Sequence, residues 1–280
     1  HRDLHSFPTR RSSDLGRLIV KHISSRDNPS IKHFQALAGS ARDRRKAGET
    51  LLDGAHLLEV ALQHGVSPLQ VVVSESGREQ PEIAALLALC LPESLVEVPD
   101  RLFAQISPVD SPSGVLARVA IPDPSVMSVT GNCVLLDAVQ DPGNLGTILR
   151  TAAAVGLRDV LLTPGCAQAW SPRVLRAAMG AHFHLDIREG VEPATALAGY
   201  PGQILAADLV EATDLYDTDL RGPVAWLFGS EGQGLSDPVA ALATRRIIIP
   251  MPGGMESLNV GVAAAVCLFE QLRQMRASGR

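Results

Sequence analysis

The amino-acid sequence predicts two successive α/β domains, the second built on a parallel sheet. Short apolar runs alternate with amphipathic stretches along most of the 280 residues, and this alternation is typical of strands joined by crossover helices. Pro122-Asp123-Pro124-Ser125 interrupts the alternation with a stiff polar stretch of the kind that links domains. Apolar residues make up 46% and charged residues 20% of the chain, as in ordinary globular proteins. We therefore place a first domain at 16–120, a linker at 121–131 and a second domain at 132–280.

Residues 1–15 are set apart from both domains. They contain no Met, no apolar signal-peptide region and no periodicity, and their sequence resembles translated adapter DNA fused upstream of a gene. We expect them to be a scar of sequence assembly and exclude them from the fold prediction.

The first domain is expected to alternate helices and strands. Leu57, Leu58, Ala61 and Leu62 lie at helical spacing, and Pro81 fits the first turn of another helix. The expected helices are 29–45, 55–64, 81–89 and 101–106, and the expected strands are 51–52, 69–73, 95–98 and 114–119.

Charge is unevenly distributed along this domain. The formal net charge of the chain is −5, yet between Arg17 and Lys46 eight Lys and Arg residues are accompanied by only two Asp. A basic segment on an acidic protein is typical of a polyanion-binding site, and it is equally compatible with a solvated helix face. Aromatic residues are only 4% of the chain, so base stacking on an aromatic platform is not expected to dominate a nucleic-acid contact. The candidate contacts are Arg26, Lys32, Arg42, Arg44, Arg45 and Lys46.

The cysteines and histidines predict no metal site. The four cysteines are far apart and form no CxxC pair, which is typical of reduced thiols in a cytoplasmic protein. His182 and His184 alternate as in a strand, and no Cys or His partner lies close to them in the sequence. No apolar stretch reaches the ~20 residues that a membrane span requires, so a membrane partner is not expected.

The second domain contains five apolar runs that predict strands at 133–136, 160–163, 204–207, 224–228 and 247–249. Helices are expected at 147–155, 173–178 and 258–273. The last helix carries an apolar stripe at helical spacing, which we expect to be core: Leu258, Val262, Ala265, Phe269 and Leu272.

The remaining sides of that last helix are also apolar, at Ala263, Ala264 and Val266. A helix that is apolar on most sides must be buried on most sides. In a three-layer α/β domain an outer helix contacts its own sheet on one side only, so we expect a second copy of the chain to cover the other.

Three polar loops follow buried strands of this domain, at 141–146, 229–235 and 250–259. In open α/β sheets the carboxyl ends of the strands form the edge where ligands bind, so the loops are expected to build one site. Glycines at 229, 232 and 234 let the backbone turn tightly and expose N–H groups to a ligand.

Three common sites do not fit these loops. Residues 143–146 lack the G-x-G-x-x-G spacing of a dinucleotide-binding loop. A phosphate-binding P-loop would need Gly-Lys-Ser or Gly-Lys-Thr, and neither occurs. Gly229-Ser230-Glu231 lacks the G-x-S-x-G form of a serine nucleophile. What remains is an α/β site with unusual polar residues: Asn144, Arg150, Glu231, Ser257 and Asn259.

In order and spacing, the loops resemble the three motifs of the SpoU-type (TrmH-like) RNA ribose 2′-O-methyltransferases of the SPOUT class. The first motif is Asn-Leu-Gly-Thr-Ile-Leu-Arg-Thr-Ala at 144–152, the second is 229–235, and the third is Ile-Pro-Met at 249–251 with Ser-Leu-Asn-Val at 257–260. The front half is similar, more loosely, to the substrate-binding domain of the ribosomal-RNA branch, through 26–29, 51–54 and 113–117. That domain in turn resembles small RNA-binding ribosomal proteins.

The resemblance implies a trefoil-knotted α/β domain that binds S-adenosylmethionine in the knot and works as a homodimer. Family members hold the cofactor largely through backbone groups of the second and third motifs, which explains loops built of Gly and Pro. The residues that the resemblance assigns to cofactor binding are Leu227, Gly229, Gly234, Ile249, Met251 and Leu258.

The implied reaction moves a methyl group from a sulfonium to a ribose hydroxyl. Charge is neutralised along this reaction, so positioning and desolvation are expected to contribute most. The resemblance gives Arg150 the role of activating the hydroxyl. Because a guanidinium keeps its proton up to about pH 12, orienting the hydroxyl or a flanking phosphate is physically easier for Arg150 than acting as a base. Glu231 is expected to orient Arg150 through a bidentate pair, and Asn144 and Asn259 to fix neighbouring groups.

Each of these residues also has a simpler interpretation. Asn144 could be only a helix cap, Arg150 a surface cation and Glu231 a loop-stabilising carboxylate. Ser257 could be the N-cap of the last helix.

The sequence thus predicts an S-adenosylmethionine-dependent RNA ribose 2′-O-methyltransferase that acts on large-subunit ribosomal RNA. One alternative is a transfer-RNA methyltransferase of the same fold, which the ribosomal type of the front domain disfavours. A second is a non-catalytic RNA-binding member of the family, which the intact Arg150, Glu231 and Asn259 disfavour. The expected partners are RNA and a second copy of the chain.

Overall fold

The computed structural model describes residues 21–109, 111–124, 128–208 and 212–278. The chain divides into two compact units: residues up to Ser40 with Leu51–Ala120, and Ala41–Thr50 with residues from Ile121 on. The first unit differs from the predicted domain 16–120 by the segment 41–50. Residues 1–15 and residues 125–127 of the predicted linker lie outside the described residues.

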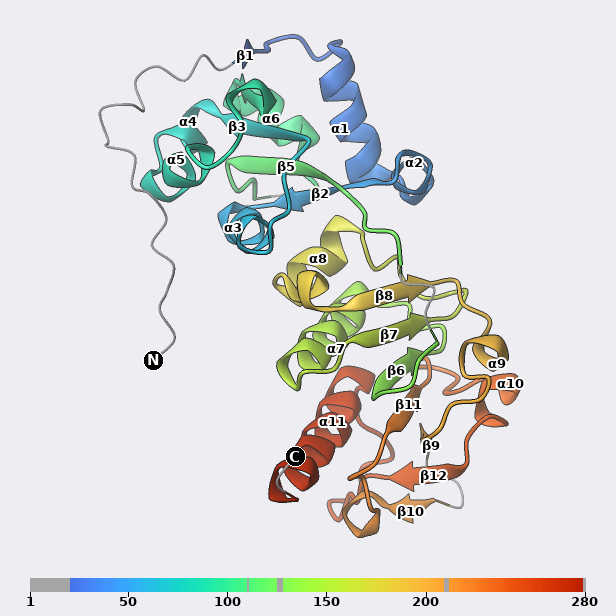
Figure 1. Cartoon of the computed structure of the whole chain (residues 1–280). Coiled ribbons are helices and arrows are strands. Elements are labelled where there is room, and N and C mark those ends of the chain that lie inside the picture. The colour runs from blue at the N-terminus through green and yellow to red at the C-terminus, as the bar shows by residue number, and fades with distance from the viewer. Residues whose placement is uncertain (1–20, 110, 125–127, 209–211, 279–280) are drawn as a thin grey trace. The chain divides into compact units, whose positions relative to one another are not determined.

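The first unit is built on a five-stranded sheet of order β1-β4-β3-β5-β2 (Figure 1). Strand β3 is parallel to β4 and antiparallel to β5, so this sheet is mixed. Its strands are β1 (Lys21–His22), β2 (Glu49–Asp53), β3 (Gln70–Ser74), β4 (Leu95–Val98) and β5 (Val115–Ala120). Its helices are α1 (Pro29–Gly39), α3 (Ala55–Gln63), α4 (Glu75–Arg78), α5 (Pro81–Leu87) and α6 (Asp100–Ile106), with a short 3-10 turn, η2 (Pro92–Ser94).

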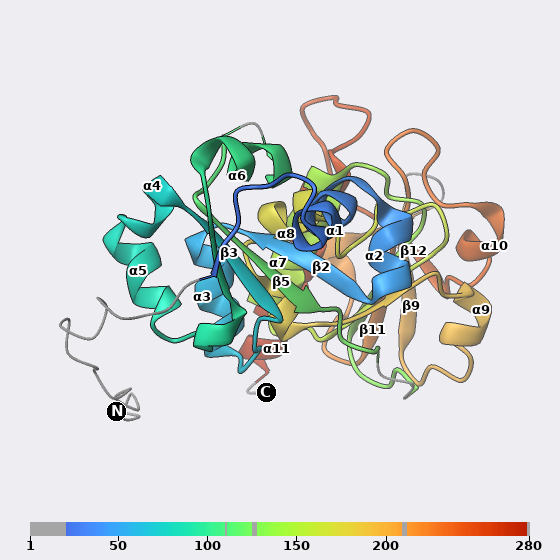
Figure 2. The ribbon, with the colours of Figure 1, turned by 90° about the horizontal axis from the view of Figure 1, so that it is seen from above.

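The basic helix predicted over 29–45 is two helices. Helix α1 begins at Pro29, where the side chain of Asn28 accepts a hydrogen bond from the N–H of Ser30 at 2.9 Å, and it ends at Gly39. Ser40 is extended, with φ −124° and ψ 115°, and α2 (Ala41–Ala47) follows as a separate helix (Figures 1 and 2). The break follows Gly39, because glycine is less favourable than alanine inside a helix by about 1 kcal/mol.

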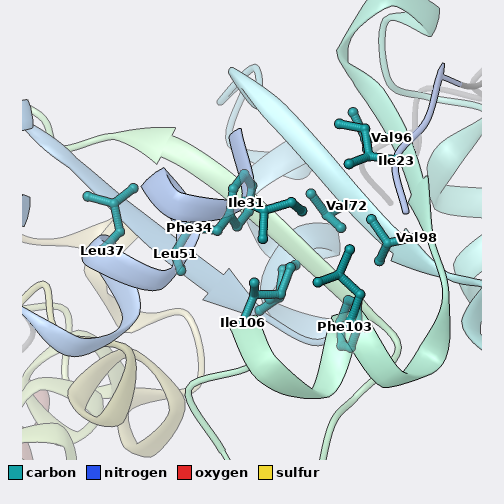
Figure 3. Close-up of a cluster of buried hydrophobic side chains, with 12 residues drawn as sticks. Ile23, Ile31, Phe34, Leu37, Leu51, Val72, Val96, Val98, Phe103 and Ile106 are labelled. Carbon is teal, nitrogen blue, oxygen red and sulfur yellow. The ribbon is translucent and has the colours of Figure 1, made fainter. Parts of the chain in front are cut away.

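The core of the first unit lies between its sheet and the helices α1 and α6 (Figure 3). Helix α1 contributes Ile31, Phe34 and Leu37, spaced three residues apart and therefore on one face. Val72 of β3 and Phe103 of α6 pack into the same cluster. Each of these side chains is at most 1% exposed, and full burial of such a side chain stabilises a fold by about 1.5–3 kcal/mol.

The second unit is built on a seven-stranded sheet of order β10-β12-β9-β11-β6-β7-β8, in which every strand pair is parallel. The parallel sheet predicted for this domain is thereby confirmed. Its strands are β6 (Cys133–Leu136), β7 (Asp159–Leu162), β8 (Asp186–Glu189), β9 (Gln203–Ala207), β10 (Thr213–Asp214), β11 (Val224–Phe228) and β12 (Arg245–Ile248). Its helices beyond α2 are α7 (Pro142–Ala154), α8 (Pro172–Ala178), α9 (Pro193–Ala196), α10 (Asp237–Ala240) and α11 (Val260–Ala277), with the 3-10 turns η3 (Ala181–His184) and η4 (Leu215–Asp217).

Two strands of this sheet were not predicted, β8 and β10. They are the two edge strands, and edge strands need no continuous apolar run because they are not enclosed on all sides. His182 and His184, whose alternation suits a strand, lie instead in the 3-10 turn η3.

Helices α7, α8 and α11 cover one face of the sheet, and α9 and α10 the other (Figure 1). Helix α7 packs closely against α8. A Cβ atom on Gly146 of α7 would lie 2.3 Å from the Cβ of Ala177. The glycine of the first motif is therefore required for the contact between these two helices.

The stripe expected as the core face of the last helix is wrong. Val262 and Phe269 are 49% and 51% exposed, and Leu258 precedes the helix at 38% exposed. The buried face of α11 carries smaller or polar side chains instead: Gly261, Ala264, Cys267, Leu268, Glu270 and Gln271.

Close packing and one buried hydrogen bond explain why this face of α11 is the buried one. A Cβ atom on Gly261 would lie 3.2 Å from the Cγ2 of Thr147 on α7, so a large side chain does not fit there. The side-chain oxygen of Gln271 accepts a hydrogen bond at 2.9 Å from the indole N–H of the fully buried Trp226. A prediction that assigns the largest apolar residues to the core therefore selects the exposed face of α11.

His182 makes the stability of the second unit depend on pH. Its side chain is 2% exposed, its Nε2 lies 2.8 Å from the carbonyl oxygen of Ala169, and its ring lies 4.9 Å from that of Trp170. Burial lowers the pKa of His182 from 6.5 to about 4. Between these values the unfolded chain binds a proton that the folded chain does not, so the free energy of unfolding falls as the pH falls from 6.5 to 4.

We expect this residue to contribute about 3 kcal/mol to that fall, at 1.36 kcal/mol per pKa unit. His182→Gln keeps a donor for Ala169 and does not titrate in this range. Urea unfolding at pH 7, 5.5 and 4 should therefore show a flatter pH dependence for His182→Gln than for the parent. Parallel dependences in the two proteins would contradict the assignment.

Candidate active site

A cavity of about 470 Å³ opens at the carboxyl ends of β9, β11 and β12, in the second unit. This volume is in the range of small-molecule sites, and the position is the edge where ligands bind in parallel sheets. The second motif, the third motif and the residues after β9 all line it. The lining residues are Ala207, Asp208, Phe228, Gly229, Ser230, Glu231, Gly234, Ile247, Ile249, Met251, Ser257, Leu258, Asn259, Val260 and Ala263.

The loop of the second motif is closed by its own backbone. Ser230 and Gly234 exchange two hydrogen bonds of 3.0 Å, each N–H donating to the other carbonyl oxygen. A Cβ atom on Gly229 would lie 2.0 Å from the carbonyl carbon of Gly234, and Gly234 has φ +70°. Both glycines are therefore needed for the loop to fold onto itself.

A buried carboxylate fixes the far end of the same loop. Asp137 follows β6 and is 6% exposed. It accepts hydrogen bonds from the N–H of Ser236 at 2.8 Å and from the hydroxyl of Thr163 at 2.9 Å. The loop after β11 is thus tied to the two neighbouring strands β6 and β7.

A chain of side-chain hydrogen bonds joins the three motifs. Asn259 caps α11, its Oδ1 accepting from the N–H of Gly261 at 2.9 Å. Its Nδ2 donates to Oδ1 of Asn144 at 2.9 Å, and Nδ2 of Asn144 donates to Oε1 of Glu231 at 2.6 Å. Asn144 sits on the first turn of α7, whose N-cap is Asp141. The structure therefore brings together three of the five residues predicted to be catalytic.

The expected pairing of Glu231 with Arg150 is wrong, because Glu231 accepts from Asn144 instead. Arg150 lies six residues beyond Asn144, about 240° around the helix at 3.6 residues per turn. Its side chain is exposed and does not line the cavity. Among the described residues, no hydrogen bond or ion pair engages its guanidinium.

Ser257 lines the cavity as predicted for a site residue, but it is not the cap of the last helix. That cap is Asn259, two residues later. The helix accordingly begins at Val260 rather than at Leu258.

Five of the six residues predicted to bind a cofactor line the cavity: Gly229, Gly234, Ile249, Met251 and Leu258. The sixth, Leu227, is fully buried in β11 and does not line it. Sequence reasoning missed Ala207 and Asp208 at the end of β9. Because 204–207 was predicted as a strand of the same sheet, its carboxyl end could have been assigned to the site by the rule used for the other loops.

The cavity lining is acidic. Asp208 and Glu231 contribute carboxylates, and no described lining residue is Lys or Arg. An ion pair of 3.2 Å between Arg246 and Asp208 fixes the first carboxylate. Such a lining favours a ligand that carries positive charge.

The residues predicted to contact a polyanion are distributed over both units. Arg26 and Lys32 belong to the first unit, where Lys32 pairs with Asp27 at 3.2 Å. Arg42, Arg45 and Lys46 are exposed on α2 of the second unit. Arg44 is 5% exposed, and its Nε donates to the side-chain oxygen of Gln168 at 2.8 Å.

Within the part of the chain that the structure describes, no group of three or more His, Cys, Asp or Glu side chains could hold a metal ion. No described helix is both long enough and apolar enough to cross a membrane. All four cysteines are free thiols.

Comparisons with known proteins match both units. The SpoU rRNA Methylase family matches residues 131–269, and the MRM3-like substrate binding domain matches residues 28–117. A relative from Synechocystis, described as an uncharacterized tRNA/rRNA methyltransferase, is 35% identical over 92% of this chain and 96% of its own length. A 23S rRNA (uridine(2479)-2′-O)-methyltransferase of Streptomyces viridochromogenes is 31% identical over 93% of this chain and 94% of its own.

Solved structures give the same result. An rRNA methyltransferase of Sinorhizobium meliloti with bound AdoMet superposes with a TM-score of 0.79 at 30% identity, over 91% of this chain and 98% of that one. The SpoU methyltransferase AviRb of Streptomyces viridochromogenes, also with AdoMet, gives 0.79 at 29% identity over 90% and 100%. The chain therefore belongs to the SpoU rRNA methylase family, as the resemblance of its three motifs predicted.

Proposed function

We propose that this chain transfers the methyl group of S-adenosylmethionine to a ribose 2′-hydroxyl of ribosomal RNA. Two relatives are named as 23S ribosomal-RNA 2′-O-methyltransferases, and residues 28–117 match the MRM3-like substrate binding domain. The observation that carries the proposal is the hydrogen-bonded chain Asn259–Asn144–Glu231 at the rim of the cavity. It places polar side chains of all three motifs beside a site of cofactor size.

The cavity fits S-adenosylmethionine in size and in charge. This cofactor carries a sulfonium, an ammonium and a carboxylate, so its net charge is positive. The described lining offers two carboxylates, Glu231 and the Arg246-paired Asp208, without a Lys or Arg. When bound, it supplies an electrophilic methyl group. Gly229 and Gly234 bring the backbone to the lining, and Ile249, Met251 and Leu258 provide apolar contacts for an uncharged ring.

The side chains around the cavity position the acceptor. Glu231 is held by Asn144 at 2.6 Å, so its carboxylate keeps a fixed place at the rim, where it can accept a hydrogen bond from a ribose hydroxyl. Arg150 is a permanent cation beyond the cavity and is suited to hold a phosphate that flanks the acceptor ribose. In this scheme both side chains act by orientation.

Two further features belong to the same proposal: a trefoil knot, which the resemblance implies, and a cytoplasmic location, which the separated cysteines predict. Strand β12 lies between β9 and β10 in the sheet, and the chain then continues to α11, which packs on α7. This path brings the third motif against the second around the cavity. Free thiols at all four cysteines agree with a reducing compartment.

The function is tested by incubating the protein with methyl-labelled cofactor and either ribosomal or transfer RNA. We expect label in ribosomal RNA, at a ribose that becomes resistant to alkaline cleavage. Label in transfer RNA alone would show that the substrate is transfer RNA rather than ribosomal RNA. Cofactor binding without label in any RNA would favour a non-catalytic family member.

The exposed cations of α2 should contribute to RNA affinity through phosphate contacts. We expect the triple variant Arg42→Gln, Arg45→Gln, Lys46→Gln to reduce the slope of log affinity against log salt by about 2, since each neutralised phosphate contributes about 0.7 to 0.9. Filter binding of ribosomal RNA between 50 and 200 mM salt measures this slope. Cofactor affinity is the control and should not change, and an unchanged slope would show that these residues form only a solvated face.

A further inference from the structure

Residues 41–50 interrupt the first unit and belong to the second. The chain passes to the second unit after Ser40, returns after Thr50, and passes again after Ala120. Between the first two passages it forms α2, turns at Gly48 with φ +65°, and enters β2. The methyltransferase unit thus carries a short basic segment that the sequence alone assigned to the other domain.

Helix α2 is too short and too polar to be stable by itself. It has seven residues, Ala-Arg-Asp-Arg-Arg-Lys-Ala, and its only buried side chain is that of Arg44. Isolated helices shorter than about 12 residues are marginal in water, and this one has no apolar face to bury. Its conformation therefore depends on the contacts of Arg44.

Those contacts are made with the segment 168–170, directly before α8. The Nε of Arg44 donates to Oε1 of Gln168 at 2.8 Å, and the Glu189 carboxylate attracts the same guanidinium. Six residues on, the hydroxyl of Thr50 donates to the carbonyl oxygen of Trp170 at 2.5 Å. Two polar contacts, made by Arg44 and by Thr50, thus attach residues 41–50 to one segment.

The receiving segment is itself fixed from the other side. The N–H of Ala169 donates to Oε1 of Glu189 at 2.7 Å, and the carbonyl oxygen of Ala169 bonds to the ring of His182 at 2.8 Å. Trp170 is 5% exposed. Because every one of these partners lies in the second unit, α2 is attached to a rigid part of that unit.

The other cations of α2 are exposed to solvent, unlike Arg44. Arg42, Arg45 and Lys46 are exposed, while Arg44 alone is buried among the four. A buried cation costs stability unless it is paired, so the paired position of Arg44 marks a structural role. Its exposed neighbours remain available to phosphates.

We propose that residues 41–50 are an RNA-binding strap of the methyltransferase unit, in which Arg44 is the anchor and Arg42, Arg45 and Lys46 are the phosphate contacts. The proposal rests on the proposed function for its RNA partner. By holding α2 in one place, Arg44 aligns bound RNA with the cavity of the same unit. Arg44 is thus a positioning residue that makes no contact with RNA.

Adjacent residues give a matched pair of variants. Arg44→Gln and Arg45→Gln remove the same charge from neighbouring positions, one buried and one exposed. Gln168→Ala removes the partner of the anchor without changing any charge. Arg44→Lys and Arg45→Lys keep the charge but lose the planar fork that binds a side-chain oxygen in fixed geometry.

In the free protein we expect Arg44→Gln and Gln168→Ala to raise amide hydrogen exchange in 41–47 by roughly tenfold or more, the loss expected for one charge-assisted hydrogen bond. Arg45→Gln should leave it at the parent level. With ribosomal RNA, Arg45→Gln should lower the salt slope by about 0.7 and raise the KM for RNA. Arg44→Gln and Gln168→Ala should lower kcat instead. Of the two lysine variants, Arg44→Lys should behave like Arg44→Gln, and Arg45→Lys should behave like the parent.

Two outcomes would contradict the assignment of Arg44 as the anchor of α2. One is parent-like exchange in 41–47 for both Arg44→Gln and Gln168→Ala. The other is full rescue by Arg44→Lys together with parent-like kinetics of Gln168→Ala, which would make Arg44 a phosphate contact. If Arg44→Gln fails to fold, the neutral Gln168→Ala decides alone. Failure of the parent to methylate ribosomal RNA would refute the proposed function, whereas the exchange result in the free protein would still decide the anchor.

Discussion

Arg150→Ala is expected to reduce methyl transfer to RNA by about 10²- to 10³-fold, the usual effect of removing one group that stabilises the transition state. Arg150 belongs to the first motif and is exposed on α7, six residues beyond Asn144. Because no described residue engages its guanidinium, the charge is free to bind the phosphodiester of the acceptor strand. Single-turnover assays at saturating RNA and cofactor measure the change.

Cofactor affinity separates this role from a structural one. Arg150 does not line the cavity, so calorimetric titration of Arg150→Ala with S-adenosylmethionine should match the parent. Arg158→Ala is a suitable control, since Arg158 is another exposed arginine, four residues beyond the end of α7. Arg150→Lys keeps the charge without the fork and should fall between the parent and Arg150→Ala. Parent-like turnover by a folded Arg150→Ala protein would refute the assignment.

The parts of the fold that could be predicted are those in which burial on both faces leaves a continuous apolar run. Strands β6 and β11 are buried at every position, and both were found at their observed bounds from composition alone. The loops after β11 and β12 could be assigned to one site because carboxyl ends of parallel strands share an edge.

Other features depend on contacts between distant residues, which no local pattern contains. The burial of Arg44 requires Gln168, 124 positions away, so a basic run in the sequence gives no sign that one of its members is an anchor. The partner of Glu231 was misassigned for a related reason. Arg150 has the complementary charge, but the angular position of Asn144 on α7 places its amide next to the carboxylate.

The exposed stripe of α11 leads to the last expectation, that the protein is a homodimer and that Phe269→Arg makes it monomeric. Leu258, Val262 and Phe269 are large apolar side chains between 38% and 51% exposed. Val262 and Phe269 lie two turns apart on one side of α11, with Leu258 just before the helix, and exposed apolar side chains gathered in this way favour an interface. We propose a second copy of the chain as the partner, as the family resemblance implies. A charged side chain buried in such an interface costs about 2 to 4 kcal/mol, which weakens dimerisation by roughly 30- to 1,000-fold.

Sedimentation at micromolar concentration should show a dimer for the parent and a monomer for Phe269→Arg. The substitution is at a half-exposed position, so thermal stability of the monomer should change little. Leu89→Arg is the matched control, because Leu89 is 58% exposed in the first unit and its variant should remain dimeric. Activity should fall with the dimer, since Leu258 both lines the cavity and begins the exposed stripe, so that loss of the partner opens the cavity rim to water. A parent protein that is monomeric and fully active at these concentrations would refute the dimer.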